Sequence, residues 1–433
     1  KKVQDELMAD FTEKRVLLKG NPIPSFINPV FVGPQEIEKY KRVTEVIMSS
    51  LEKVANLFYT EPSLEPLFQL REGEDVLTKV DHGYDGRIQH GRLDAFVVDG
   101  VVRFCEFNCD TPGGPGWLDL MSAALLKTPA MSKLGEQYKL SFEALMPGIL
   151  DGLLACYKDW CAKKGKTPED KPRIAVTTIP ALDPTNDEID NIGIWLREQG
   201  YDAIVAPAKD CVYEDGKFMV KGQHVELVYR RGAGFWWLNN PEDYAGHKAA
   251  YEAGAVCMVN PISSKLGGKK SLMAVLQSDK MAEHLTKEEK EFVDRHIPWT
   301  RTVAEKETKY QGEKVDLIPF LKKNRENMVL KPIGLFGGKD VVVGKDATDE
   351  EWLATIEKAL KEAYVVQEFI PIPTIKLPVC TEDGIKFEEK KVNMNFYAFN
   401  GKYAGGLARV SDSNVINVCA GGGIVPIVTV DEK

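Results

Sequence analysis

Two alternating runs, DAFVVDG and VVRFCEFN, constrain the fold of this 433-residue chain more than any other segment. They meet at Asp99-Gly100, a dipeptide that tolerates the positive φ angles of a two-residue turn. The runs therefore predict a β-hairpin. Because successive side chains of a strand point to opposite faces, Glu106 and Asn108 lie on one face, with Asp110 just beyond the strand end.

The first strand of this hairpin carries a matching polar pair. Arg92 and Asp94, in HGRLDAF, alternate and so share a face, and the turn sets Asp94 roughly opposite residues 104–106. The oxygens of Asp94, Glu106 and Asn108 form a hard ligand set of the kind that binds Mg²⁺. The alternative is a cross-strand pair between an arginine and a carboxylate on a solvated sheet face.

Composition is that of an ordinary soluble globular protein. Hydrophobic residues make up 43% and charged residues 28%, and the net charge of −9 argues against a nucleic-acid backbone or an anionic membrane as main partner. No apolar run approaches the ~20 residues of a membrane helix, and the first residues, KKVQDELMADF, lack the apolar segment of a secretory signal. Eight cysteines without a CxxC pair predict reduced thiols, and we expect a cytoplasmic protein.

Hydrophobic periodicity predicts a chain of mixed α/β (α+β) class in three regions. An N-terminal region (1–165) contains the hairpin, a small α/β domain (170–260) reads strand, helix, strand, and a third region (261–433) ends in strands. Helices are expected over residues 35–60, 118–127, 135–162, 270–295 and 349–362.

Glycines gather in NMVLKPIGLFGGKDVVVG (327–344), between two short apolar strands. Glycine lets backbone N–H groups approach a phosphate closely, and Lys331 at the end of the first strand can reach the same phosphates. The alternative is a glycine-rich hairpin with one solvated lysine. The nearby LGGKKSL (266–272) is not a P-loop, because Lys270 stands where Ser or Thr is required.

Two further segments fit a nucleotide site only in combination with these glycines. YVVQEFIP (364–371) ends an apolar strand where adenine could form hydrogen bonds with the backbone between apolar side chains. Arg409, in GGLARVS, offers the fork of donors that suits phosphate. An ordinary strand end and a surface salt bridge are the alternatives.

Taken together, these segments resemble the circularly permuted ATP-grasp ligases, and within them the glutathionylspermidine synthetase-like group. The resemblance covers roughly residues 80–425 and is carried by Arg92-Leu93-Asp94, residues 106–111, Tyr229-Arg230-Arg231, Lys270, Lys331-Pro332, Gln367-Glu368 and Arg409. In ordinary ATP-grasp proteins the metal-binding Glu-x-Asn follows the lysine and hinge segments, whereas here it precedes them. A permuted chain would have this order.

The resemblance implies an ADP-forming ligase that uses ATP and Mg²⁺ to join a carboxylate to an amine through an acyl phosphate. It implies that Asp94, Glu106 and Asn108 hold Mg²⁺, that Arg92 stabilises the acyl phosphate and that Arg409 is a second phosphate clamp. Lys331 would bind ATP phosphates beneath a loop of Gly334, Gly337 and Gly338, and Gln367, Glu368, Phe369 and Ile370 would bind adenine. Arg301 would be a further basic nucleotide ligand, and Asp110, Arg231 and Lys270 would face the substrate.

Departures from the family pattern leave the substrates open. The loop reads Leu335-Phe336-Gly337-Gly338 instead of the frequent Arg-Glu-Gly, and residues 107–111 replace the common Tyr-Asn-Ala-Asp-Thr, so glutathione and spermidine do not follow as substrates. Lys265, Lys269 and Lys270 are alternatively a solvated lysine face. Rival functions are a phosphotransferase, a non-catalytic nucleotide-binding protein and a structural protein with a polar sheet edge.

Overall fold

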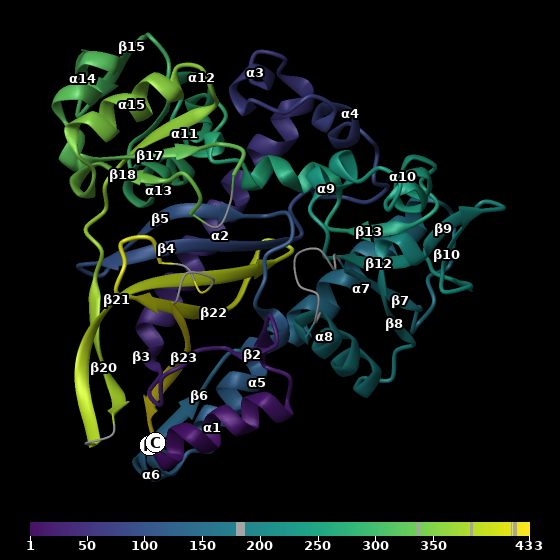
Figure 1. Ribbon diagram of the computed structural model, residues 1–433. Coiled ribbons are helices and arrows are strands. Elements are labelled where there is room, and N and C mark those ends of the chain that lie inside the picture. Colours follow the sequence, from purple (N-terminus) through teal and green to yellow (C-terminus); the bar gives the residue numbers. More distant parts are fainter. Residues whose placement is uncertain (179–186, 336–337, 382–383, 417, 419–421) are drawn as a thin grey trace.

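The computed structural model describes residues 1–178, 187–335, 338–381, 384–416, 418 and 422–433. Its main strands form a large central sheet, a small antiparallel sheet and a parallel sheet, which lie in different parts of the molecule (Figure 1). Among these residues, no helix combines the length and the apolar character needed to cross a membrane.

The central sheet joins strands from the N-terminal and C-terminal parts of the chain. Its strand order is β3-β23-β22-β21-β4-β5, with β20 paired to β21 and β6 paired to β23. The strands span Val30–Val32 (β3), His90–Val98 (β4), Val101–Asn108 (β5), Tyr138–Ser141 (β6), Thr374–Thr381 (β20), Gly384–Phe399 (β21), Lys402–Ser411 (β22) and Gly423–Glu432 (β23). The pairing of β21 with β4 therefore brings late segments beside the hairpin.

The hairpin of β4 and β5 forms as the sequence predicts. Asp99 and Gly100 both have positive φ, at 50° and 74°, as a tight two-residue turn requires. Asp94 lies opposite Glu106, and Arg92 lies opposite Asn108. The register shifts between Asp94 and Ala95, and this shift brings the two polar pairs into alignment at the end of the hairpin away from the turn.

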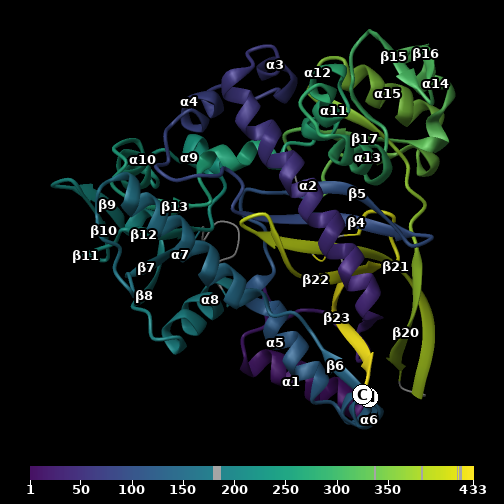
Figure 2. The same ribbon diagram turned by 180° about the vertical axis from the view of Figure 1, so that it is seen from behind.

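Helix α2 (Pro34–Thr60) runs across one face of the central sheet (Figure 2). It begins at Pro34 because proline suits the first turn of a helix. The Glu36 carboxylate accepts the Gly33 N–H at 2.6 Å and satisfies a donor that the helix leaves unpaired. Its apolar residues recur at helical spacing, as in Ile47 and Leu51, and are buried against the sheet.

The small antiparallel sheet carries the glycine-rich segment predicted from the sequence. Its order is β14-β19-β17-β18, and the strands span Thr300–Thr302 (β14), Met328–Pro332 (β17), Val342–Val343 (β18) and Tyr364–Glu368 (β19). Helices α14 (Leu317–Lys323) and α15 (Asp349–Ala359) complete its core, in which Trp352 and Ile356 are buried with Leu330.

The parallel sheet confirms the strand-helix-strand pattern of the small α/β region. Its order is β13-β12-β7-β8, with β7 (Ile174–Thr178), β8 (Ala203–Pro207), β12 (Leu227–Arg230) and β13 (Cys257–Val259). Helix α8 (Asp187–Glu198) lies between β7 and β8 in the sequence. After β8 the chain forms a separate three-stranded antiparallel sheet of β9 (Cys211–Glu214), β10 (Lys217–Val220) and β11 (Gln223–His224). The boundaries at residues 165, 170 and 261 stay predictions.

The remaining elements surround these sheets. The helices are α1 (Lys2–Glu13), α3 (Glu65–Phe68), α4 (Glu74–Thr78), α5 (Pro115–Leu126), α9 (Gly234–Asn239) and α10 (Ala245–Glu252). Two short hairpins pair β1 (Leu17–Leu18) with β2 (Asn21–Pro22) and β15 (Glu307–Tyr310) with β16 (Glu313–Asp316).

Two long helices expected from the sequence are broken in the structure. The segment predicted as helix 135–162 contains the end of α6 (Pro129–Gln137), strand β6 and most of α7 (Leu145–Lys163), because YKLS pairs with β23. The segment predicted as helix 270–295 holds α11 (Ser271–Leu276), α12 (Asp279–Ala282) and α13 (Lys287–His296). Ser278 and Thr286 start the last two by accepting backbone N–H groups at their N-caps, a signal that periodicity alone does not register.

A buried histidine in the core beside the parallel sheet predicts a loss of stability at acidic pH. Burial lowers the pKa of His247 to about 3, and neither ring nitrogen has a hydrogen-bond partner in the described part of the chain. The unfolded chain therefore binds more protons between pH 6.5 and 3, so stability falls as the pH drops through that window. From pH 7 to pH 5 we expect this one group to cost about 2 kcal/mol.

Denaturant unfolding of the His247→Phe variant at pH 7 and pH 5 checks this. The pH-dependent loss should shrink by about that amount relative to wild type, whereas His284→Phe, at a partly exposed position, should leave the pH dependence nearly unchanged. An equal pH dependence in wild type and His247→Phe would contradict the prediction.

Candidate active site

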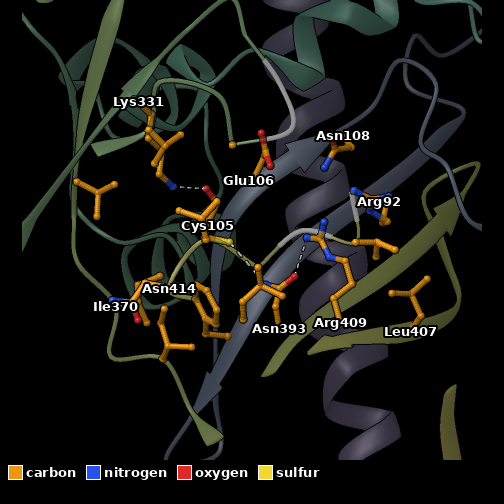
Figure 3. A pocket seen from close by; sticks show the side chains of 18 of the residues that line it. Arg92, Cys105, Glu106, Asn108, Lys331, Ile370, Asn393, Leu407, Arg409 and Asn414 are labelled. Carbon is orange, nitrogen blue, oxygen red and sulfur yellow. Dashed lines mark hydrogen bonds between the residues drawn. The ribbon is translucent and has the colours of Figure 1, made fainter. Parts of the chain in front are cut away.

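A cavity of about 370 Å³ is lined by residues of the central sheet and of the small antiparallel sheet of β14, β19, β17 and β18. Figure 3 shows the polar side chains that project into it from both sides. From the central sheet come Arg92, Phe96, Cys105, Glu106, Asn108, Asn393, Leu407 and Arg409; from the small sheet and its connections come Val329, Lys331, Gly338, Val341, Val343, Gln367, Glu368, Phe369 and Ile370. This space, called the first cavity, brings most of the sequence-predicted residues together.

Asp94 accepts hydrogen bonds from three polar side chains that the central sheet contributes to the cavity wall. Its side chain is 1% exposed, and its two oxygens accept hydrogen bonds from Arg92 Nε at 2.7 Å and Arg92 Nη2 at 3.1 Å. One oxygen also accepts from Asn108 Nδ2 at 3.1 Å and from Arg409 Nη2 at 2.7 Å. Asp94 therefore fixes three side chains that face the cavity, and it does not line the cavity itself.

The two arginines of this wall are largely buried, with 15% and 16% of their side chains exposed. Burial acts to lower the pKa of Arg92, but the adjacent Asp94 carboxylate outweighs it and raises the pKa above its ordinary value. Arg409 Nη2 also donates to Asn393 Oδ1 at 2.7 Å, as drawn in Figure 3. Arg409 Nε is buried without a partner among the described residues, so it is a donor ready for an anion.

Lys331 projects from β17 toward β5. Its Nζ donates to the Cys105 carbonyl at 3.0 Å (Figure 3). It also donates to Gln367 Oε1 at 2.6 Å. Burial lowers the pKa of Lys331. Lys331 thus connects the small antiparallel sheet to the central sheet. Its ammonium group lines the first cavity, where it can reach phosphate oxygens.

Glu106 is one of three carboxylates that line the cavity, with Glu188 and Glu368, and 29% of its side chain is exposed. Lys270 Nζ lies 2.9 Å from Glu106 Oε1 and also donates to the Leu335 carbonyl at 2.6 Å. Burial acts to raise the pKa of Glu106, but Lys270, Lys331 and Arg409 outweigh it and lower the pKa to about 2. The carboxylate is therefore ionised throughout the neutral range, as a metal ligand must be.

The donor set fits Mg²⁺ at Glu106 and Asn108 rather than at all three predicted ligands. Asp94 is sealed behind the arginines, so a cation there would have to displace a guanidinium group. Within the described ranges, no group of three His, Cys, Asp or Glu side chains is placed to hold a metal. One carboxylate and one amide suffice for Mg²⁺ when phosphate oxygens and water complete its coordination.

Residues 367–370 contribute two polar side chains, Gln367 and Glu368, and two apolar side chains, Phe369 and Ile370, to the cavity wall. The backbone N–H groups of Glu368 and Phe369 already donate to the carbonyls of Trp299 and Asn327, both at 2.8 Å. These two amides are therefore already paired within the protein, and the predicted backbone hydrogen bonds to adenine would have to come from other groups of this segment. Val329, Val343 and Ile370 offer apolar surfaces that would enclose a flat ring.

Other predicted residues lie away from the first cavity. Arg301 turns toward Thr308 Oγ1 (2.9 Å) and lines a separate cavity of about 350 Å³. Arg231 donates to the Pro112 carbonyl at 2.8 Å and pairs with Glu188 at 3.1 Å, so it is a buried structural cation. The structure thus does not bring Arg301 or Arg231 to the nucleotide-facing or substrate-facing positions expected for them.

The three remaining predicted residues are placed differently. Asp110 pairs with buried Arg230 and accepts the Gly234 N–H at 3.1 Å, which commits its two oxygens. Gly334 lines a neighbouring cavity, and Gly337 lies outside the described residues.

Sequence reasoning missed several residues of this site. Asn393 orients Arg409, yet the alternation of VNMNF on β21 is the same kind of polar pattern that revealed Glu106 and Asn108. Gly113 belongs to the wall because its carbonyl accepts from Arg92 Nη1 at 3.0 Å and from the Tyr397 hydroxyl at 2.5 Å. Nothing local in the sequence indicates that second contact.

Comparison with solved structures identifies the fold. A glutathione synthetase-like effector (GSS30) from Globodera pallida, in apoform, aligns with a TM-score of 0.61 at 14% identity, over 98% of this chain and 97% of that one. A candidate gamma-glutamylcysteine synthetase from Methylobacillus flagellatus KT gives 0.42 at 12% identity over 89% and 88%, and a RimK domain ATP-grasp protein from Sphaerobacter thermophilus gives 0.27 at 15% over 60% and 90%. Only the first score is high enough to establish a shared fold.

The chain has a mixed α/β fold that it shares with the glutathione synthetase-like effector. This confirms the mixed α/β class predicted from the sequence, whereas the permuted ATP-grasp arrangement stays a prediction. At 14% identity the likeness shows the fold alone, and activity has to be argued from the site. No family model and no curated protein matches the chain.

Proposed function

We propose that the protein is an ADP-forming ligase that uses Mg²⁺ and ATP to join a carboxylate to an amine. The observation that carries the proposal is the composition of the first cavity. One wall offers Lys331, Gly338 and an apolar slot, and the opposite wall offers two arginines and the ionised carboxylate of Glu106. Phosphoryl transfer depends on positioning and charge neutralisation, and these walls supply both.

Each side chain has a role in this scheme. Val329, Val343 and Ile370 enclose adenine, and Lys331 binds the phosphates at the cavity floor. Arg409 and Arg92, both oriented by Asp94, neutralise the phosphoryl group as it moves. Glu106 and Asn108 would hold Mg²⁺, which when bound neutralises phosphate oxygens.

The reaction balances without a covalent intermediate on the protein. A carboxylate oxygen attacks the γ-phosphorus, the bond to the bridging oxygen breaks and ADP leaves. The amine nitrogen then attacks the acyl carbon of the acyl phosphate, inorganic phosphate leaves, and the nitrogen loses a proton. The arginines stabilise charge on the phosphoryl group in both steps.

Three further parts of the proposal come from the resemblance. The hairpin of β4 and β5 precedes the glycine-rich segment in the chain but shares the first cavity with it, which supports a permuted order. A likeness to glutathionylspermidine synthetases and a peptide-like substrate belong to the same proposal. The six described cysteines are free, in keeping with a reducing compartment such as the cytoplasm.

Thermal unfolding with and without Mg²⁺ and a non-hydrolysable ATP analogue tests the nucleotide site. A ligand that binds only the native state adds about 2.7 kcal/mol at a hundred times its dissociation constant, which raises the midpoint of a chain this long by roughly 3 °C. Lys331→Met should abolish the shift, and Lys322→Met, on the exposed side of α14, should retain it. No shift in wild type at millimolar analogue would refute the proposed site.

ADP release separates the rival activities. A ligase releases ADP in proportion to an acid and an amine supplied together, and the product contains a new amide bond. A phosphotransferase instead leaves a stable phosphorylated product and ignores the amine. Nucleotide binding without ADP release for any acceptor would favour a non-catalytic protein.

A further inference from the structure

A second cavity of about 250 Å³ adjoins the first. Glu106, Asn108 and Lys270 line both cavities, so the two spaces meet at the proposed metal ligands. Its other walls come from five parts of the chain, within residues 71–74, 107–111, 233–236, 265–269 and 333–335.

Each carboxylate of the second cavity already has a cation. Glu74 pairs with Lys269, and both side chains are at most 5% exposed. Glu106 pairs with Lys270, and Asp110 pairs with Arg230. None of these carboxylates is left to neutralise a further positive charge. The three lysines that the sequence left open as a solvated face are cavity residues instead, and Lys269 is 2% exposed.

Two cations of this cavity have no carboxylate partner among the described residues. Arg71, at the exposed mouth, donates to the Gly334 carbonyl, and Lys265 is half-buried. Both lie against the Phe235 ring, at 6.0 Å and 5.2 Å from its centroid. The Phe235 ring attracts both positive charges and so offsets part of their mutual repulsion.

Occupation of the first cavity would increase this positive charge. If Glu106 turns to Mg²⁺, Lys270 loses its carboxylate partner and, among the described residues, keeps only the Leu335 carbonyl. The second cavity then holds one free cation at the junction with the phosphates and two at its mouth. An anion at each end would complement that arrangement.

We propose that the second cavity binds the acid substrate, and that this acid carries a second carboxylate, held by Arg71 and Lys265. The inference rests on the proposed ligase function. The reacting carboxylate lies at the junction beside Lys270, because among the described residues the two cavities share only Glu106, Asn108 and Lys270. The second carboxylate is a specificity determinant, and it takes no part in the bond changes.

Isothermal calorimetry with straight-chain diacids from malonate to pimelate, and with their monoamides, tests the inference in the presence of Mg²⁺ and ADP. At least one diacid is expected to bind, and its monoamide at least ten-fold more weakly, because the amide gives the two cations no charge to pair with. Lys265→Met and Arg71→Met should each weaken that diacid at least ten-fold, and Arg71→Lys should recover part of the loss. Lys209→Met, at an exposed position lining neither cavity, should bind like wild type.

Three outcomes would each overturn the inference. They are that none of the diacids binds, that a diacid and its monoamide bind equally, or that Lys265→Met and Arg71→Met both bind the diacid like wild type. Thermal midpoints near that of wild type establish that the variants fold. The Mg²⁺-nucleotide shift in the same samples reports on the first cavity separately, because neither Arg71 nor Lys265 lines it. A normal shift without diacid selectivity therefore removes the inference alone, whereas a missing shift removes the proposed function.

Discussion

Replacing Asp94 with asparagine should lower the free energy of unfolding by about 3–5 kcal/mol, the range seen when one partner of a buried ion pair is removed. Asp94 is 1% exposed, and Arg92 and Arg409, on two different strands, both donate to it. Asparagine has nearly the same shape but no charge, so the two guanidinium groups would face each other uncompensated. Both would also lose their orientation toward the first cavity.

Denaturant unfolding measures this loss, and Asp99→Asn is the matched control. The same chemical change there falls at an exposed turn residue with φ of 50°, a conformation that asparagine adopts readily, so stability should change by less than about 0.5 kcal/mol. A loss below about 1 kcal/mol in Asp94→Asn would mean that the arginines do not depend on this carboxylate.

The hairpin is the part of the site that local sequence rules could predict. A two-residue turn sets the register, so Asp94 was expected roughly opposite residues 104–106, and it lies opposite Glu106. The exact pairing depends on the register shift after Asp94, which the turn does not predict. The same rules cannot say which polar residues face the cavity and which are sealed beneath it. That difference depends on Arg409 of β22, which approaches Asp94 only once β21 and β22 join the sheet.

The predicted roles of Arg301 and Arg231 in ligand binding also depend on contacts that only the folded chain makes. A basic residue near a nucleotide motif in the sequence is a candidate ligand, but its direction is set by the strand it occupies and by the partners it finds. Arg301 finds Thr308 on the adjoining hairpin, and Arg231 finds Glu188 on α8. The broken helices show a related limit: β6 exists because the edge of β23 offers it a partner, which helical periodicity cannot reveal.

Glu106→Gln should reduce ATP-dependent turnover at least a hundred-fold while the protein stays folded. The neutral amide removes the charged oxygen proposed to bind Mg²⁺, and a hundred-fold loss corresponds to about 2.7 kcal/mol of transition-state stabilisation. The fold should survive because 29% of this side chain is exposed to the cavity and Lys270 keeps its bond to the Leu335 carbonyl. The midpoint of thermal unfolding without ligands should therefore move by no more than a few degrees, roughly.

Initial rates of ADP release as a function of Mg²⁺ concentration are the sharpest readout for this variant. A lost metal ligand should raise the Mg²⁺ concentration needed for half-maximal rate as well as lower the maximum. Glu389→Gln provides the control, because Glu389 is an exposed residue of β21 in the same sheet and should behave as wild type. If folded Glu106→Gln turns over ATP at the wild-type rate with the same Mg²⁺ dependence, the metal is held elsewhere, and the polar face of the hairpin serves only to orient Arg92 and Arg409.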